Sequence, residues 1–217
     1  MRQPPSGTLA LAVALTAIAG FVDAIGFLSL RHYFVSFMSG NTTQFAVAAG
    51  RGDAHAALAA IGIVGTFVAA VAAGRFASCR APNGYRPMIL LAEAALIGTA
   101  AMADIALAGA TGLLVIAMGL QTALVHRAGE TRTSLTYVTG TLVSVGEKLS
   151  DAVSGRGAPW AWWRDLCLWT ALVLGAVAGT MAYAPVGKAA LMLASCVLAL
   201  LAAVMAVPSW RAHRRQR

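Results

Sequence analysis

Long apolar stretches separated by short polar segments run through the whole sequence. A helix needs about 20 predominantly apolar residues to cross a bilayer. Six stretches predict spans at residues 8–30, 54–74, 88–107, 112–126, 166–184 and 189–207. Backbone groups in lipid must bond within their own segment, so we expect each span to be an α-helix. The pattern therefore predicts an all-α polytopic membrane bundle that forms a single domain over residues 1–217.

Two turn signals predict which helices are neighbours. Gly109 follows the third span, and Pro-Val-Gly at 185–187 follows the fifth. A short connection between two helices makes them antiparallel neighbours. We therefore expect the third span to pack on the fourth, and the fifth on the sixth.

Composition and charge support a lipid environment. Charged residues make up 11% of the 217-residue chain and apolar residues 59%, whereas soluble domains average about 25% charged residues. The net charge of +8 would fit a nucleic-acid partner if the basic residues formed one patch, but they fall in short clusters between apolar stretches. We therefore expect the lipid bilayer as the partner, and no nucleic acid.

The basic residues also predict the orientation. With the N-terminus inside, 13 of the 16 Lys and Arg residues lie on the cytoplasmic side, including the basic tail at 208–217, and Arg31, Arg51 and Lys188 lie outside. This distribution satisfies the positive-inside rule. The first apolar stretch continues to Leu30, which is too long for a secretory signal. We expect a multi-pass protein of the bacterial inner membrane with both termini in the cytoplasm.

Two segments outside the spans, 31–51 and 132–148, are centred on small polar residues. Phe-Met-Ser-Gly-Asn-Thr-Thr at 37–43 matches Tyr-Val-Thr-Gly-Thr at 137–141 in kind, at an offset of 100 residues. Upstream of these segments, Gly-Phe-Val-Asp-Ala-Ile parallels Gly-Leu-Gln-Thr-Ala-Leu at an offset of 99. Two matches in the same order indicate a duplication.

The duplication predicts tandem repeats at 8–108 and 110–207. Each repeat holds three spans and one polar-centred segment, and an odd number of crossings would insert the two copies with opposite topology. Inverted repeats are a common plan of secondary transporters, in which broken helices form the site at the repeat interface.

The polar-centred segments are expected to be re-entrant. Asn41 could cap a short helix, with Gln44 completing a capping box, and residues 42–49 would make a helix of only about 12 Å. The alternative is that both segments cross fully and give eight spans, since 31–51 would reach about 30 Å as a straight helix. Eight spans would distribute the basic residues more evenly, so we favour six spans.

Four ordered motifs resemble those of the YoaK-like family, a bacterial family of multi-span inner-membrane proteins of unknown function. They are Gly-Phe-Val-Asp-Ala-Ile-Gly-Phe at 20–27, Ser-Gly-Asn-Thr at 39–42, Met-Gly-Leu-Gln at 118–121 and Tyr-Val-Thr-Gly-Thr-Leu at 137–142. The resemblance covers essentially the whole chain, with Ser39 and Thr122 as departures where relatives more often carry Thr and Asn. It implies a membrane bundle and no settled activity.

Two carboxylic acids inside the spans are candidate functional residues. Asp23 lies in the last third of the first span, and Glu93 lies about six residues inside the third. A charged side chain at the bilayer centre costs about 2.5–3.5 kcal/mol on insertion scales, so such residues usually serve a pathway or a partner. The alternatives are that Asp23 reaches Arg31 at the interface and that Glu93 pairs with Arg86.

The small polar residues supply the rest of the expected substrate or ion site. We expect the two glycine-centred segments to meet near the bilayer midplane, and Gln121 and Thr122 to join them or to serve as hydrogen-bonding glue between helices. The residues of the two segments are Ser39, Gly40, Asn41, Thr42, Thr43, Thr139, Gly140 and Thr141.

Gly175 and Gly179 form a GxxxG pattern. The pattern predicts close helix packing, either within the subunit or in a homo-oligomer.

Motifs of soluble enzymes are missing from the sequence. It carries neither a phosphate-binding loop nor His-Glu-x-x-His, so we expect no enzyme activity, no metal and no cofactor. The first hypothesis is a secondary transporter or channel for a small solute, coupled to protons through Asp23 and Glu93. The second is a non-transporting membrane protein with an interaction or regulatory role.

Overall fold

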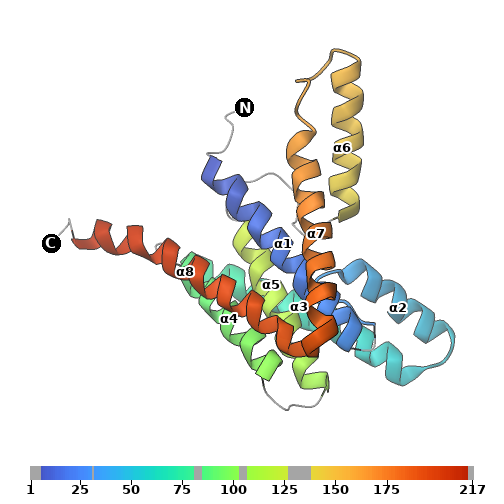
Figure 1. The fold of residues 1–217 in the computed structure, drawn as a ribbon. Helices are drawn as coiled ribbons and strands as arrows, with labels where there is room; N and C mark the ends of the chain where they lie inside the picture. Colours follow the sequence, from blue (N-terminus) through green and yellow to red (C-terminus); the bar gives the residue numbers. More distant parts are fainter. Residues whose placement is uncertain (1–5, 31, 81–84, 103–106, 127–137, 215–217) are drawn as a thin grey trace.

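The computed structural model describes residues 6–30, 32–80, 85–102, 107–126 and 138–214. Within these ranges the chain forms eight α-helices, one short 3-10 helix and no β-strand. In chain order they are α1 (Ser6–Ser29), α2 (Met38–Gly50), α3 (Ala54–Arg80), α4 (Tyr85–Met102), α5 (Leu107–His126), α6 (Val138–Val153), α7 (Trp163–Val186), η1 (Gly187–Ala190) and α8 (Leu191–Arg214) (Figure 1). The predicted all-α bundle is confirmed.

Three stretches of the described residues are long and apolar enough to cross a membrane. They are Leu9–Ser29, Ala54–Arg80 and Trp163–Ala206, and the last contains α7 and α8; Ala108–Leu124 in α5 is apolar but shorter. With 13 and 16 residues, α2 and α6 are about 20 and 24 Å long, below the ~30 Å of a hydrocarbon core. Their lengths favour re-entrant segments over two further spans.

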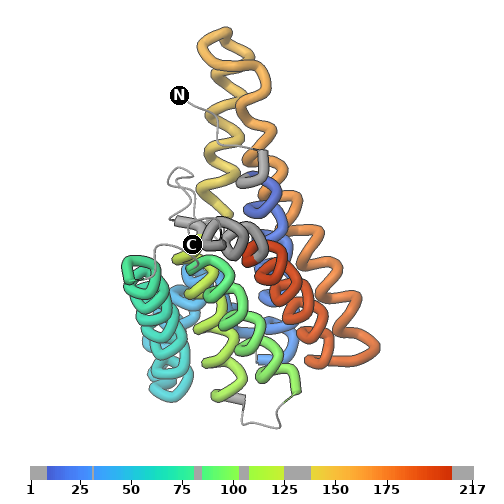
Figure 2. Tube along the Cα trace, turned by 90° about the vertical axis from the view of Figure 1, so that its left-hand side faces the viewer, coloured from blue at the N-terminus to red at the C-terminus, as the bar shows by residue number. Residues whose placement is uncertain are grey.

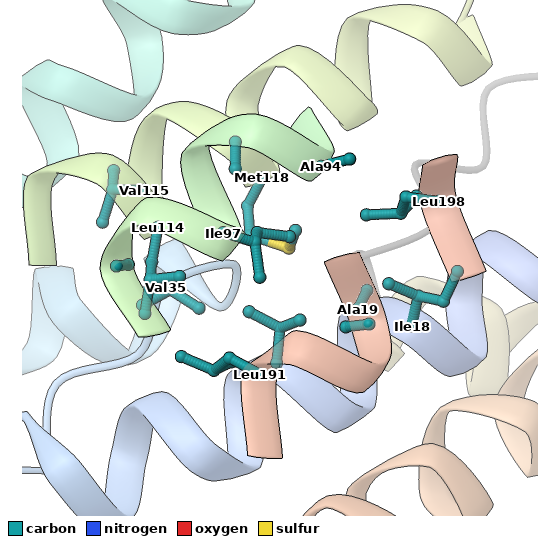
Figure 3. Close-up of a cluster of buried hydrophobic side chains, with 14 of the residues drawn as sticks. Ile18, Ala19, Val35, Ala94, Ile97, Leu114, Val115, Met118, Leu191 and Leu198 are labelled. Atoms are coloured by element: carbon teal, nitrogen blue, oxygen red, sulfur yellow. The ribbon is translucent and has the colours of Figure 1, made fainter. Parts of the chain in front are cut away.

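The core is apolar and is formed by α1, α4, α5 and α8 together with the loop after α1. Figure 3 shows side chains from these elements converging on one volume: Ile18, Ala19, Val35, Ala94, Ile97, Leu114, Val115, Met118, Leu191 and Leu198. The helices α2 and α6 lie outside this core. Among the described elements, α2 contacts only α3 and α6 contacts only α7, and the α6–α7 pair extends beyond one end of the bundle (Figures 1 and 2).

Glycines mark the two crossings that hold α7 to α1 and α3 to α5. Gly20 of α1 lies against the backbone of Leu172 on α7, and Gly119 of α5 lies against the backbone of Phe67 on α3. The two glycines, at 20 and 119, are 99 residues apart. Their partners, at 67 and 172, are 105 residues apart. Each crossing therefore uses a glycine without a side chain to bring two backbones together.

A second pair of contacts repeats this spacing. Gly179 of α7 lies against Phe21 of α1, and Gly74 of α3 lies against Leu120 of α5. α1 runs in the opposite direction to α5, and α7 runs in the opposite direction to α3 (Figures 1 and 2). The crossing of α3 and α5 therefore repeats the crossing of α1 and α7 with the chain direction reversed.

Two predicted turns have different outcomes. α7 ends at Val186, and Gly187 adopts a φ of +59°, a left-handed conformation that glycine accepts without strain. The turn at 185–187 is confirmed, although Pro185 still belongs to the last turn of α7. The expected packing of the fifth span on the sixth is wrong, because α8 packs on α4 and, among the described elements, makes no contact with α7. The turn at Gly109 is wrong, because Gly109 lies inside α5. Apolar residues on both sides of Gly109 let the helix continue through it.

Candidate functional site

The carboxyl group of Asp23 organises the loop between α1 and α2. Its Oδ1 accepts hydrogen bonds from the backbone N–H groups of Val35 (2.7 Å) and Ser36 (3.0 Å). Its Oδ2 accepts a third bond from the Ser36 hydroxyl, at 2.9 Å. The partner proposed for Asp23 in the interfacial interpretation, Arg31, lies outside the described residues. Both Asp23 oxygens are thus already used by the protein itself.

The side chain of Asn41 holds the same loop from the other side. It is completely buried, its Oδ1 accepts from the N–H of Phe34 at 3.0 Å, and its Nδ2 donates to the Phe34 carbonyl at 2.7 Å. The predicted capping box is wrong. α2 begins at Met38, before Asn41, and Gln44 donates to the carbonyl of His32. The amide of Asn41 takes the place of a backbone hydrogen-bond partner for Phe34, because Phe34 lies in a loop without helical hydrogen bonds.

Together these two side chains satisfy a break in helical structure. Backbone polar groups in lipid must find partners inside the protein, and residues 34–36 have no helical ladder. Asp23 and Asn41 supply four of the required bonds. The motifs at 20–27 and 39–42 therefore have a clear structural role.

The hydroxyl groups of the first glycine-centred segment face away from the core. Ser39, Thr42 and Thr43 are exposed. The Thr42 hydroxyl donates to the Met38 carbonyl, and the Thr43 hydroxyl donates to that of Ser39, both within α2. Gly40 packs under aromatic rings, since an added Cβ would lie 2.8 Å from the Phe37 ring.

The second glycine-centred segment lies in α6, with Thr139 exposed, Gly140 half-buried and Thr141 buried. No contact joins α2 to α6 within the described chain, and the two helices are well apart in Figure 1. The predicted meeting of the two segments in one midplane site is therefore wrong. Each short helix packs instead on the long helix that follows it.

Glu93 of α4 lies at the centre of the bundle. Its side chain has 0% exposure, and neither carboxyl oxygen has a hydrogen-bond partner among the described residues. The alternative pairing with Arg86 is absent, because the Arg86 guanidinium contacts the Tyr85 hydroxyl instead, at 3.3 Å. Glu93 is thus a carboxylic acid in an apolar core with unused hydrogen-bonding capacity.

Gln121 of α5 also has some unused hydrogen-bonding capacity. Its Nε2 donates to the carbonyl of Leu15 on α1 at 2.7 Å, while its Oε1 is buried and has no partner in the described chain. Thr122 donates to the carbonyl of Met118 in its own helix. Gln121 therefore acts as interhelical glue through its nitrogen alone.

Glu93 and Gln121 lie on neighbouring helices of the bundle. The helices α4 and α5 pack on each other and run antiparallel (Figure 1), and both side chains are buried. No hydrogen bond joins the two side chains.

One polar cluster was not anticipated from the sequence. Asp165 of α7 is 6% exposed, and its Oδ2 accepts from the Ser144 hydroxyl at 2.8 Å and from the Lys148 ammonium group. Ser144 and Lys148 are four residues apart and share a face of α6. The spacing of Ser144 and Lys148 indicates a shared polar face in the sequence, but it does not identify Asp165 as the partner. The cluster holds α6 to α7.

The GxxxG pattern acts within the subunit. An added Cβ at Gly175 would collide with the backbone of Ala17, and one at Gly179 would collide with that of Phe21. Both glycines are therefore covered by α1, and the expectation of a homo-oligomer through them is wrong. Their missing side chains already serve the contact between α1 and α7.

The fold and its buried polar centre define an α-helical integral membrane protein. Residues 11–204 match a family described as a protein of unknown function, DUF1275, and the chain belongs to this family. It is 37% identical over 210 residues to the UPF0700 transmembrane protein RA0705 of Rhizobium meliloti (strain 1021), covering 95% of this chain and 90% of the relative. The resemblance to a membrane family of unknown function is confirmed. No solved structure matches the chain.

Proposed function

We propose that this protein moves a small solute across the bacterial inner membrane, with Glu93 as the proton-coupling carboxyl group. The observation that carries the proposal is the complete burial of Glu93 without a hydrogen-bond partner in the described chain. A buried polar group without a partner costs about 1–3 kcal/mol. A structural role does not repay that cost here, because the carboxyl group holds no other described element in place.

Its position supports the same role. Ionisable residues inside membrane segments usually line substrate or proton pathways. The Oε1 of Gln121, on the neighbouring helix α5, is also buried without a partner in the described chain, so the core offers two groups to a transported proton or solute. The centre of the site is thus proposed in the core between α4 and α5, away from the glycine-centred segments.

The helix arrangement supports an inverted-repeat architecture. The glycine crossings recur at spacings of 99 and 105 residues with reversed chain direction. Burial follows the same order along α2 from 41 to 50 as along α6 from 141 to 150. We propose that α1–α4 and α5–α8 are two copies related by a pseudo-two-fold axis in the membrane plane, a plan that suits alternating access.

Solid-supported-membrane electrophysiology on proteoliposomes tests the function. Amino acids, sugars, carboxylates, amines and small neutral apolar solutes are applied under a proton gradient, and we expect at least one to evoke a current that protein-free liposomes lack. Glu93→Gln should abolish this current. Glu147→Gln is the matched control, because Glu147 is exposed on α6. A current that survives Glu93→Gln, or no current from any solute class, contradicts the proposal.

A second candidate function is a non-transporting role in membrane interactions or regulation. The separation of α2 from α6 favours it, because the polar segments then serve only to complete the fold. The same electrophysiological panel separates the two. A well-folded protein that gives no current, but is isolated from its native membrane with a stoichiometric protein partner, supports the second candidate.

A further inference from the structure

A cavity of about 640 Å³ lies between α3 and α5 beside the loop after α1. It is distinct from the core around Glu93, which does not line it. Small and apolar residues form most of its wall, among them Ala59, Gly62 and Ile63 of α3 and Gly112 and Val115 of α5. Its volume falls within the range of roughly 300–1,000 Å³ that is usual for small-molecule sites.

The glycine crossing explains why the space exists. Gly119 brings α5 against Phe67 of α3, and Gly74 continues this contact further along. Two helices that touch at a crossing diverge on either side of it, and the cavity occupies the diverging half that contains His55 and Thr66. Those two residues are eleven positions apart, so the cavity extends for about 16 Å along α3, roughly half of a bilayer core.

The charges around the cavity define what it accepts. Among the described residues, only two ionisable carboxyl or imidazole side chains line it, those of Asp53 and His55, and both are exposed at the start of α3. Arg51 is exposed next to Asp53, so these two opposite charges lie together near the opening. Deeper in the cavity, no described lining residue is charged. A charged solute there would meet no counter-charge from these residues, and burying an unpaired charge is costly.

The polar groups near the opening are partly in use. Asp53 Oδ1 accepts from the N–H of Ala56 at 3.0 Å, and the Tyr33 hydroxyl donates weakly to the Ala56 carbonyl at 3.4 Å. Thr66 and Thr111 also line the cavity. With few polar groups in an otherwise apolar wall, the lining suits a solute that has one neutral polar group and is apolar elsewhere.

We propose that this cavity binds small, uncharged, largely apolar solutes that carry one hydrogen-bonding group. The binding does not depend on the proposed function. The further role of the cavity as the entry to a transport route rests on that function. The orientation predicted from the basic residues puts the opening, which lies beside Arg51, on the outer side of the membrane.

The test uses 5-fluoroindole as a neutral probe and protein in lipid nanodiscs, with fluorine NMR as the readout. We expect saturable binding that unlabelled indole competes away. Tryptamine and indole-3-acetate, which carry a charged side chain on the same ring system, should compete poorly. Gly62→Trp should weaken binding by at least about tenfold, because an added Cβ at Gly62 points into open space and the indole ring would fill the cavity.

Gly65→Trp is the matched control. Gly65 lies on the same helix, also has open space around it and does not line the cavity, so its binding should equal that of the wild type. Gly112→Leu blocks the cavity from α5 and guards against a folding defect in Gly62→Trp. Thermal melting confirms that each variant is folded.

Three results would overturn the binding site. Equal binding in Gly62→Trp, Gly112→Leu and wild type would place the probe elsewhere. Equal signals from protein-free nanodiscs would show partition into lipid alone. Absence of saturation, with a lipid acyl chain seen in the cavity, would make it a lipid groove. Binding that behaves as expected without any transport current would instead defeat the proposed function and leave the site intact.

Discussion

The carboxyl groups of Asp23 and Glu93 lie in opposite hydrogen-bond environments. Three donors from Val35 and Ser36 reach Asp23, whereas no donor in the described chain reaches Glu93. A bonded carboxylate stabilises the fold, and an unbonded buried one destabilises it. Substitutions at the two positions should therefore change stability in opposite directions.

Asp23→Ala should lower the melting temperature in detergent much more than Asp23→Asn. Alanine leaves the N–H groups of Val35 and Ser36 without a partner, at about 1–3 kcal/mol each. Asparagine keeps one oxygen for both N–H groups and can donate to the Ser36 hydroxyl, so it should cost only about 1 kcal/mol. Asp151→Ala, at an exposed acid on α6, should change stability by less than about 0.5 kcal/mol. Equal melting temperatures for Asp23→Ala and wild type would refute the role in the loop.

Glu93→Met should raise the melting temperature. Methionine has similar length and removes two buried oxygens that lack partners, which should stabilise the protein by about 1–3 kcal/mol. Leu90→Met, at a fully buried neighbour on α4, is the control and should cost less than about 1.5 kcal/mol. A fall in melting temperature for Glu93→Met would show that the carboxyl group holds a structural partner.

Sequence reasoning found both acids and could not tell their roles apart. A carboxylic acid inside an apolar stretch is visible from the pattern alone. The donors to Asp23 lie 12 and 13 residues downstream in an irregular loop, and no periodicity predicts such a contact. The absence of donors around Glu93 is likewise a property of packing.

At the scale of the elements, backbone-to-backbone contact at glycines holds the bundle together. Gly175→Ala should lower stability by about 1–3 kcal/mol, because the new Cβ meets the rigid backbone of Ala17. Gly65→Ala should be neutral or slightly stabilising, since nothing lies within 4 Å of that position and alanine favours helix. Chemical unfolding in mixed micelles measures both. If Gly175→Ala changed the oligomeric state and left the stability of the subunit unchanged, the GxxxG contact would lie between subunits.

Helices were predicted better than their ends and partners. The long apolar stretches correspond to α1, α3, α4, α5, α7 and α8, because lipid makes an apolar run a strong signal. The sequence predicts a start at Thr42, whereas α2 begins at Met38, since Asn41 resembles a helix cap and its true partner, Phe34, lies upstream. The separation of α2 from α6 depends on the packing of the whole chain, which neither segment encodes locally.

At the scale of the whole molecule, the charge distribution predicts that Cys79 faces the cytoplasm. Cys79 is exposed near the end of the 27-residue α3, and Arg51 lies just before its start, so the two positions are about 40 Å apart. An impermeant maleimide should label Arg51→Cys in intact spheroplasts and should reach Cys79 only after permeabilisation. The reverse labelling pattern would show that the topology is the opposite of the one predicted.

Transport and stability measured on the same two variants test the central claim most directly. Glu93→Gln and Asp23→Asn are reconstituted side by side, and solute-evoked current is normalised to folded protein. The account predicts that Glu93→Gln keeps its melting temperature and loses the current, whereas Asp23→Asn melts slightly lower and keeps the current per folded molecule. Loss of current in Asp23→Asn at unchanged stability, with full current in Glu93→Gln, would contradict it.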